Sequence, residues 1–435
     1  MKLTAIQSDK GDCLLLETQD GKHRMLVDGG MSRAYSVHAA PILGKLRKAK
    51  KKLDIVYISH IDQDHISGVL RLLDDEAAWR VHEHQKASGN TGHTAPAAPR
   101  PPEIGALFHS SFHDQVGKNS GDITSMLAAT STILSGSDEP ALQRLAEERR
   151  NLASSIPEAM RVSRRIKPGQ LNIPLNPQFG GKLMLLKDNA PTIRMGTIRL
   201  RLLGPFPEDL RKLRKEWNAW LTANQSTVAK IRAQAARDEQ DLQSRVAGPL
   251  FGPLLASARM LGEAEMALAK QLGIRSKVTT PNLASLMFLA EDGGSAILLT
   301  GDGHADDILK GLDRLQAVDA QGGIHVKVLK VQHHGSENNI HQRFCDAVTA
   351  DEYVFCGNGE HENPDLDVLQ LVFDRRMAGD AKKFRFWFNS TSALSFKADG
   401  KTHMKKVEAL VKKLAAKSHG RLKNRFIAGS AMRIV

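Results

Sequence analysis

A short stretch from Ser59 to His65 contains four side chains of the types that bind metal ions in proteins. They are His60, Asp62, Asp64 and His65, and they directly follow the apolar residues 53–59. A strand cannot turn adjacent side chains to one side, so we expect a loop that points His60 with Asp62, and Asp64 with His65, toward two neighbouring ions. Imidazole and carboxylate ligands together suit zinc, manganese or iron. A polar loop capping the next helix is the plainer alternative, but this density of ligand types favours a metal site.

Three further groups of polar residues follow apolar stretches elsewhere in the chain. Asp28 follows residues 24–27, Asp302 follows residues 296–299, and the pair His333–His334 follows residues 324–331. Each group alone is weak, because Asp-Gly turns and surface histidines are common. Together they indicate that several core strands end in metal-ligand types.

The elements that must position these residues occur twice in the same order. Residues 13–17 and 24–27 predict a hairpin, residues 37–51 a helix and residues 53–59 a strand that leads to His60. Residues 285–289 and 296–299 predict a second hairpin, with a helix at 305–315 and a strand at 324–331 before His333. The order suggests an internal duplication that places both histidine groups at corresponding strand ends around one shared site.

Composition places the chain among ordinary globular proteins with a basic surface. It has 435 residues, 41% apolar and 25% charged, with 61 Lys and Arg against 48 Asp and Glu, a net charge of +13. The excess is concentrated in residues 45–52 and 401–425, which attract polyanions unless they are merely solvated helix faces. Three widely spaced cysteines make a disulfide framework unexpected. No segment has the length of a membrane span or the pattern of a signal peptide, so we expect a cytoplasmic protein.

The motif set resembles the metallo-β-lactamase superfamily of metal-dependent hydrolases. The superfamily pattern His-x-His-x-Asp-His appears here with Asp62 in place of its second histidine. That variant is similar to the hydrolase domain of the ComEC competence proteins. So are the stretches 11–15, 26–30, 298–302 and 329–336. The resemblance covers about residues 1–85, 165–206 and 277–395.

The resemblance implies an α/β fold, a four-layer αββα sandwich with two divalent ions, zinc or manganese, at one edge of the sheets. His60, Asp62 and His334 would hold the first ion, and Asp64 and His65 the second. Asp302 would bridge both ions, and Asp28 would orient a ligand imidazole from behind. His333 is either a ligand in place of His334 or a phosphate contact.

The departures from the family define the expected domains. We expect the core in residues 1–85, 165–206 and 277–400, a loop and helical insertion in 86–164, a helical hairpin in 207–276 and a basic C-terminal helix and tail in 401–435. The membrane channel of the ComEC proteins is absent. Residues 202–205 lack a histidine that superfamily members often place there, so Asn282 or another group would substitute. His361 lies near a late histidine of these relatives.

These patterns favour a phosphodiesterase, most simply a nuclease that cleaves DNA or RNA through a metal-bridged hydroxide. Asp64 would accept the proton of the water, and His333 or His361 would stabilise or protonate the leaving oxygen. Nucleic acid would contact lysines of the two basic runs, namely Lys48, Lys50, Lys51, Lys52, Lys405 and Lys412. The alternatives are a lactonase or thioesterase acting on small molecules, and a metal-poor binding module whose helical hairpin engages a protein partner.

Overall fold

Two β-sheets form the centre of the computed structural model, which describes residues 1–90, 92–109, 158–159, 161–208, 211 and 285–435. Sheet 1 has the strand order β14-β1-β2-β3-β4-β5 and sheet 2 the order β13-β12-β11-β10-β9-β8-β7-β6. The strands of sheet 1 are β1 (Lys2–Ile6), β2 (Leu14–Glu17), β3 (Arg24–Val27), β4 (Leu53–Tyr57), β5 (Ile104–Phe108) and β14 (Ala431–Arg433). The strands of sheet 2 are β6 (Ile193–Met195), β7 (Ile198–Gly204), β8 (Met287–Asp292), β9 (Ser295–Leu299), β10 (Ile324–Lys330), β11 (Val348–Phe355), β12 (Phe384–Phe388) and β13 (Leu422–Phe426).

The sheets and helices form four layers, as the sequence predicts. Side chains on alternate positions of each strand point to opposite faces. In β2, for example, Leu14 and Leu16 enter the core between the two sheets, whereas Leu15 packs under the helices that cover sheet 1. The helices over sheet 1 are α1 (Ser32–Ala34), a π-helical turn (Tyr35–Ala39), α2 (Ala40–Lys48) and α3 (Gln63–Ala87). Those over sheet 2 are α11 (Ala305–Arg314), α12 (Gln342–Ala347), α13 (Leu366–Ala378) and α14 (Ala398–Lys417).

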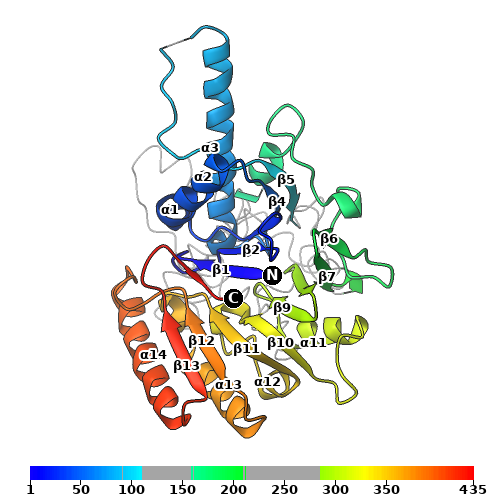
Figure 1. The fold of residues 1–435 in the computed structure, drawn as a ribbon, viewed down its shortest axis with the longest axis vertical. Helices are drawn as coiled ribbons and strands as arrows, with labels where there is room; N and C mark the ends of the chain where they lie inside the picture. Colours follow the sequence, from blue (N-terminus) through cyan, green and yellow to red (C-terminus); the bar gives the residue numbers. More distant parts are fainter. Residues whose placement is uncertain (91, 110–157, 160, 209–210, 212–284) are drawn as a thin grey trace, which may run out of the picture.

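The two halves repeat the same strand topology. β1, β2 and β3 are successively antiparallel, and β4 and β5 continue parallel to β3. β7, β8 and β9 are likewise antiparallel in succession, and β10 and β11 continue parallel to β9. The blue and cyan half lies above the yellow-to-red half in Figure 1. The expected duplication is therefore present in the arrangement of the strands, and it extends over five strands in each half.

The C-terminal segment joins both sheets. α14 packs on the outer face of sheet 2, and β13 then pairs in parallel with β12 at the edge of that sheet. The chain next crosses to sheet 1, where β14 pairs antiparallel with β1. Residues 401–435, which the sequence suggests as a basic tail, thus supply an edge strand to each sheet.

The two expected insertions lie largely outside the described residues. The range 86–164 nevertheless contains β5, which pairs in parallel with β4 inside sheet 1. A Pro-rich stretch before Ile104 obscures this strand in the sequence. The range 207–276 leaves sheet 2 after β7 and returns before β8, two adjacent antiparallel strands. Asn282, the expected substitute ligand, also lies outside the described residues.

Two structural facts bear on the cellular setting. All three cysteines, Cys13, Cys345 and Cys356, are buried and none forms a disulfide. Across the described part of the chain, every helix is too short or too polar to span a bilayer.

Candidate metal centre

The loops that follow β3, β4, β9 and β10 meet at one edge of the two sheets. This follows from the topology, because β3 and β4 are parallel and so are β9 and β10. One hydrogen bond crosses between the sheets: the N–H of Leu286, just before β8, donates to the Ser59 carbonyl at 2.7 Å. Another joins the loops after β9 and β10 of sheet 2, where the His333 N–H donates to the Gly301 carbonyl at 3.2 Å. The carboxyl ends of both half-sheets therefore present their polar residues to one shared volume.

Asp28 anchors the loop after β4. Its carboxylate accepts the Ser59 N–H at 2.7 Å and the Ser59 hydroxyl at 2.7 Å, and it lies 3.0 Å from Nδ1 of His65. All three residues are buried. The hydroxyl hydrogen of Ser59 points to Asp28, so its oxygen is free to accept Nδ1–H of His60 at 3.0 Å. Asp28 thus fixes two imidazoles at once, directly and through Ser59.

Asp302 occupies the middle of the site. Its carboxylate oxygens lie 3.6 Å from Nε2 of His60, 3.4 Å from Nε2 of His65, 3.7 Å from Nε2 of His333 and 3.5 Å from Nε2 of His334. The Asn339 side-chain amide donates to the Asp302 carbonyl at 2.9 Å and so holds its backbone. Four imidazoles from two halves of the chain therefore turn the same ring nitrogen toward one carboxylate.

The other ring nitrogen of each histidine faces an outer acceptor. Nδ1 of His333 lies 2.6 Å from Oδ1 of Asn339. Nδ1 of His334 lies 3.3 Å from Oδ1 of Asp12, an ion-pair contact in which neither atom forms a hydrogen bond within the described residues. Together with the Asp28 and Ser59 contacts, this accounts for all four rings. An acceptor at Nδ1 places the ring proton there and leaves the Nε2 lone pair free for a metal ion.

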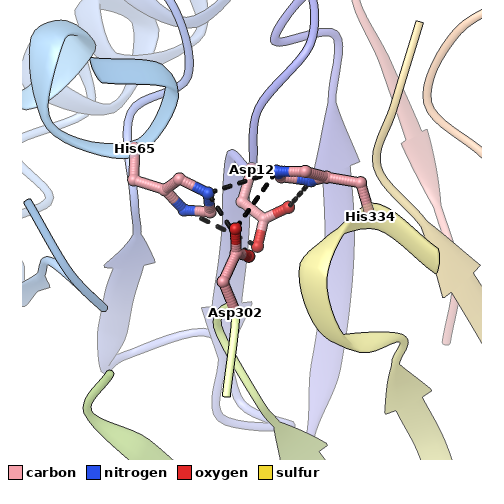
Figure 2. A group of neighbouring side chains, drawn as sticks. All are labelled: Asp12, His65, Asp302 and His334. Atoms are coloured by element: carbon pink, nitrogen blue, oxygen red, sulfur yellow. Dashed lines mark hydrogen bonds and ion pairs between the residues drawn. The ribbon is translucent and has the colours of Figure 1, made fainter. Parts of the chain in front are cut away.

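Four of these residues come from separate elements to form one compact group. They are Asp12, His65, Asp302 and His334, all buried, and one ligand atom from each lies within 4.8 Å of the others. Figure 2 shows the two imidazoles facing each other across the two carboxylates. Ligands about 2.0–2.1 Å from a tetrahedral zinc ion lie about 3.4 Å apart, close to the contacts around Asp302. The donor set is that of a divalent-metal site.

The expected ligands on the first loop also point to this centre. Oδ2 of Asp62 lies 3.5 Å from Nε2 of His60, and Oδ2 of Asp64 lies 3.2 Å from Nε2 of His334. His361 is different: it is exposed, and it lies on the turn Glu360–Glu362 after β11, outside the buried group of four. The structure brings the loop residues together and leaves His361 toward solvent.

Electrostatics of the buried group favour a bound cation. Burial raises the pKa of Asp302, but the surrounding imidazoles, led by His334 and His65, outweigh it and hold that pKa well below its usual value. Burial lowers the pKa of His65, yet Asp302, Asp28 and Asp64 reverse this and raise the pKa well above its usual value. The carboxylates therefore favour the protonated form of His65, and a metal ion would displace that proton.

Two buried polar atoms in the centre support the fit. Within the described residues, Nε2 of His60 and Oδ1 of Asp302 make no hydrogen bond, although both are shielded from solvent. The same holds for Oδ1 of Asp12 and Nδ1 of His334, which lie behind the His334 ring. Buried polar atoms are normally satisfied, so such pairs of orphans require an explanation. A cation between Nε2 of His60 and Oδ1 of Asp302 would satisfy both, because each offers a lone pair to the same volume.

Asp12 and Lys330 belong to the site, although the sequence patterns do not predict either of them. Asp12 lies in the loop between β1 and β2 and appears in the sequence only as part of a Gly-Asp pair. Lys330 ends β10 and is 1% exposed. The sequence does carry one signal for Lys330, because a lysine within the apolar run Val328–Val331 is unusual for a core strand.

The comparison with known families covers about half of the residues of this site. The metallo-beta-lactamase superfamily model matches residues 8–127. The match contains Asp12, Asp28 and the loop His60–His65, whereas Asp302 and His334 lie beyond it. No curated protein matches the chain. The four-layer arrangement of mixed sheets and helices agrees with the metallo-β-lactamase sandwich, and the superfamily match coincides with the half of the centre that Asp28 organises.

Proposed function

We propose that the protein is a metal-dependent hydrolase that cleaves phosphodiester bonds in nucleic acid. The observation that carries the proposal is the convergence of four Nε2 atoms on Asp302, each imidazole fixed from behind by an outer acceptor. Pre-oriented imidazoles and carboxylates in a buried pocket are what a tightly held metal centre requires. The metallo-beta-lactamase superfamily, whose members are generally hydrolytic metalloenzymes, matches residues 8–127, which include His60 and His65.

The distances divide the ligands into two groups that share Asp302. His65, His334 and Asp64 form one group, because Nε2 of His334 lies 3.4 Å from Nε2 of His65 and 3.2 Å from Asp64. His60 and Asp62 form the other, with His333 the remaining imidazole near Oδ2 of Asp302. We therefore assign His333 and His334 to one ion each. This revises the sequence-based grouping, in which His334 accompanied His60 and only one of the two histidines was a ligand.

Two divalent ions would supply a water nucleophile at neutral pH and neutralise the charge that develops on the phosphate. The chain's own residues hold the reactants in place. Asp302 lies between both groups, and Asp64 lies beside His334 at 18% side-chain exposure, where it can accept a proton from a water molecule. His361 is exposed and lies outside the buried group, so its proposed role is to act on a leaving group rather than to bind an ion.

The net charge of +13 supports a polyanionic substrate. Lys48, Lys50, Lys51 and Lys52 are exposed at the end of α2, just before β4 begins. They lie at the amino end of β4, whereas the metal loop follows its carboxyl end. Five strand residues span about 17 Å, so a nucleic acid that contacts both must extend along the molecule. Lys405 and Lys412 are exposed on α14.

The test is metal content together with polynucleotide cleavage. We expect purified protein to contain zinc or manganese by mass spectrometry and to cleave DNA or RNA. Asp302→Asn should lower both metal content and cleavage by more than about a hundredfold, since even outer partners of metal ligands contribute 10–100-fold. Asp351→Asn, which alters an exposed carboxylate beside Lys327, is the matched control and should retain both.

The same experiment separates the alternatives. Metal-loaded protein that hydrolyses a lactone or thioester but no polynucleotide would replace the nuclease proposal with a small-molecule hydrolase. Wild-type protein that binds no divalent metal would favour the binding module. Parallel assays on DNA and on RNA decide which of the two is the substrate, since the proposal includes both.

A further inference from the structure

A buried lysine lies beside the proposed metal centre. Nζ of Lys330 donates to the Gly301 carbonyl at 2.8 Å and forms ion pairs with Oδ2 of Asp12 at 2.5 Å and Oδ1 of Asp302 at 3.5 Å. The ammonium therefore faces one carbonyl and two carboxylates, although the contact with Oδ1 of Asp302 is an ion pair without hydrogen-bond geometry. A buried charge is costly unless it is paired in this way. The lysine is therefore a fixed part of the centre and not a mobile surface group.

Both carboxylate oxygens of Asp12 face charged groups inside the protein. Oδ2 forms an ion pair with Lys330 and lies 3.9 Å from Nδ1 of His65. Oδ1 lies 3.3 Å from Nδ1 of His334, an ion-pair contact without the geometry of a hydrogen bond. The loop that carries Asp12 is tightly held, because a Cβ at Gly11 would lie 1.7 Å from the Asp64 carbonyl oxygen. The Asn389 side-chain amide donates to Ser8 at 2.7 Å in the same loop. Asp12 thus reaches His334 from a rigid position against the metal loop.

The four histidines of the centre set the role of Asp12. Three of them have their Nδ1 atoms at Ser59, Asp28 and Asn339, and the fourth, His334, has its Nδ1 at Asp12. Asp12 lies near enough to the other ligands to be a ligand itself. However, Asp12 lies behind the His334 ring, on the side away from Nε2. Ser59, Asp28 and Asn339 lie in the same way behind the other three rings, so we place Asp12 among these outer partners.

We propose that Lys330 and Asp12 are positioning residues of the metal centre: the ammonium holds Asp12 against Nδ1 of His334, so that Nε2 of this ring faces the metal. The same ammonium, next to Asp302, offsets the charge of one carboxylate. The centre has five carboxylates, those of Asp12, Asp28, Asp62, Asp64 and Asp302. With neutral imidazoles, the five carboxylates, Lys330 and two divalent ions carry no net charge together. An anionic phosphodiester then enters a neutral site. This inference rests on the proposed metal-dependent function.

Unequal effects on metal affinity provide the test. Asp12→Asn removes the carboxylate behind His334 and should weaken metal binding about 10–100-fold in competition with a chromogenic chelator. Lys330→Met removes the ammonium that holds Asp12 in place, but it also removes a cation beside Asp302, so its loss of affinity should be smaller than that of Asp12→Asn. Both single variants should lower the melting temperature of the metal-free protein, because each leaves a buried charge without its partner.

The double variant Asp12→Asn/Lys330→Met keeps the experiment decisive if a single variant does not fold. It removes both charges, so its melting temperature should approach that of the wild type, while its metal affinity should stay at least about tenfold weaker. In ¹⁵N spectra of the metal-loaded protein, the Nδ1 signal of His334 should change most, because Asp12 lies 3.3 Å from this nitrogen and 3.9 Å from Nδ1 of His65. The matched controls are Lys327→Met and Asp351→Asn, an exposed pair on β10 and β11, which should leave affinity unchanged.

Two results would overturn the inference. One is an equal loss of affinity in both single variants with full recovery in the double variant, which would mean that the pair only stabilises the fold. The other is wild-type affinity in Asp12→Asn or the double variant. Failure of the proposed function is separate: a wild type that binds metal but cleaves no nucleic acid leaves the affinity comparison intact, whereas a wild type that binds no metal refutes both.

Discussion

At the scale of single residues, local spacing predicts the loop ligands but not their long-range partners. His60, Asp62, Asp64 and His65 are close in sequence, so the spacing of residue types alone reveals their density. Asp12 and Lys330 are 318 positions apart. They meet only because the loop before β2 and the end of β10 lie at the same edge of the sheets. A single acidic residue in a turn carries no signal of this kind. The outer partners of a metal centre are therefore harder to predict from one sequence than the ligands.

A carboxyl group near the histidines gives a pH prediction. Asp365 accepts the Glu337 N–H at 2.7 Å, and its own N–H donates to Gly335 at 3.0 Å, next to His334. Burial raises the pKa of Asp365 from its ordinary 3.8 to about 6. The folded state then binds more protons than the unfolded state in this window, so the free energy of unfolding falls as pH rises from about 4 to about 6.

We expect this loss to be about 1 kcal/mol, because the half-buried position screens part of the shift. Asp365→Asn keeps an acceptor for the Glu337 N–H and cannot ionise, so its free energy of unfolding should show a smaller decline. Urea titrations of both proteins at pH 4, 5, 6 and 7 measure the difference. Parallel pH profiles of the two proteins would contradict the assigned shift.

At the scale of elements, the predicted hairpins and strand ends agree with the structure, whereas the short edge strands escape prediction. The strands at 24–27, 53–57 and 324–330 are apolar and lead to polar residues, so periodicity and turn residues suffice. β13 and β14 are short and largely exposed, with the sequences LKNRF and AMR. Such edge strands are defined by their neighbours in the sheet, which a local pattern does not contain.

The contact between α3 and the loop after β3 determines where His65 lies. A Cβ at Gly68 would lie 2.0 Å from the Gly29 carbonyl oxygen, so the helix and the loop touch backbone to backbone. The Gly29 N–H donates to the His65 carbonyl at 2.9 Å across this contact. Helix α3 can therefore bring His65 to Asp28 only because both positions are glycine.

We predict that Gly68→Ala destabilises the protein and weakens its metal binding. In an isolated helix the same change would stabilise by about 1 kcal/mol, but here the methyl group must push α3 away from the loop. His65 would move from Asp28 and from the centre. Thermal unfolding and chelator competition measure the two effects, with Gly429→Ala as the control because an added methyl there meets nothing within 4 Å. Wild-type metal affinity in Gly68→Ala would show that the contact does not position His65.

At the scale of the whole molecule, the positive charge and the metal centre are separated. The exposed lysines at 48–52 lie at the amino end of β4 and the centre at its carboxyl end. Composition along the chain locates the basic runs but not their distance from the site, because that distance depends on the direction of β4 in the sheet. The expected protein partner of the hairpin 207–276 concerns residues outside those described.

Replacing Lys48, Lys50, Lys51 and Lys52 by Gln should weaken nucleic-acid binding in a length-dependent way. Each lost phosphate contact should reduce the slope of log affinity against log salt by about 0.9. A duplex must reach about 17 Å, or about five base pairs, before it touches both regions, so shorter substrates should be unaffected. Affinity and cleavage measured over a series of oligonucleotide lengths test this. An equal loss for a small phosphodiester would show that the lysines act at the centre itself.

The pairing of β1 with β14 sets an order of events during synthesis. Thr4 pairs with Arg433 and Ile6 with Ala431, and Figure 1 shows the two chain ends side by side. β14 is made long after β1, so the outer edge of β1 has no strand partner until β14 emerges. An open edge of this kind recruits other chains. We expect nascent chains to depend on chaperones until β14 emerges, and the metal centre to close only after both halves are made.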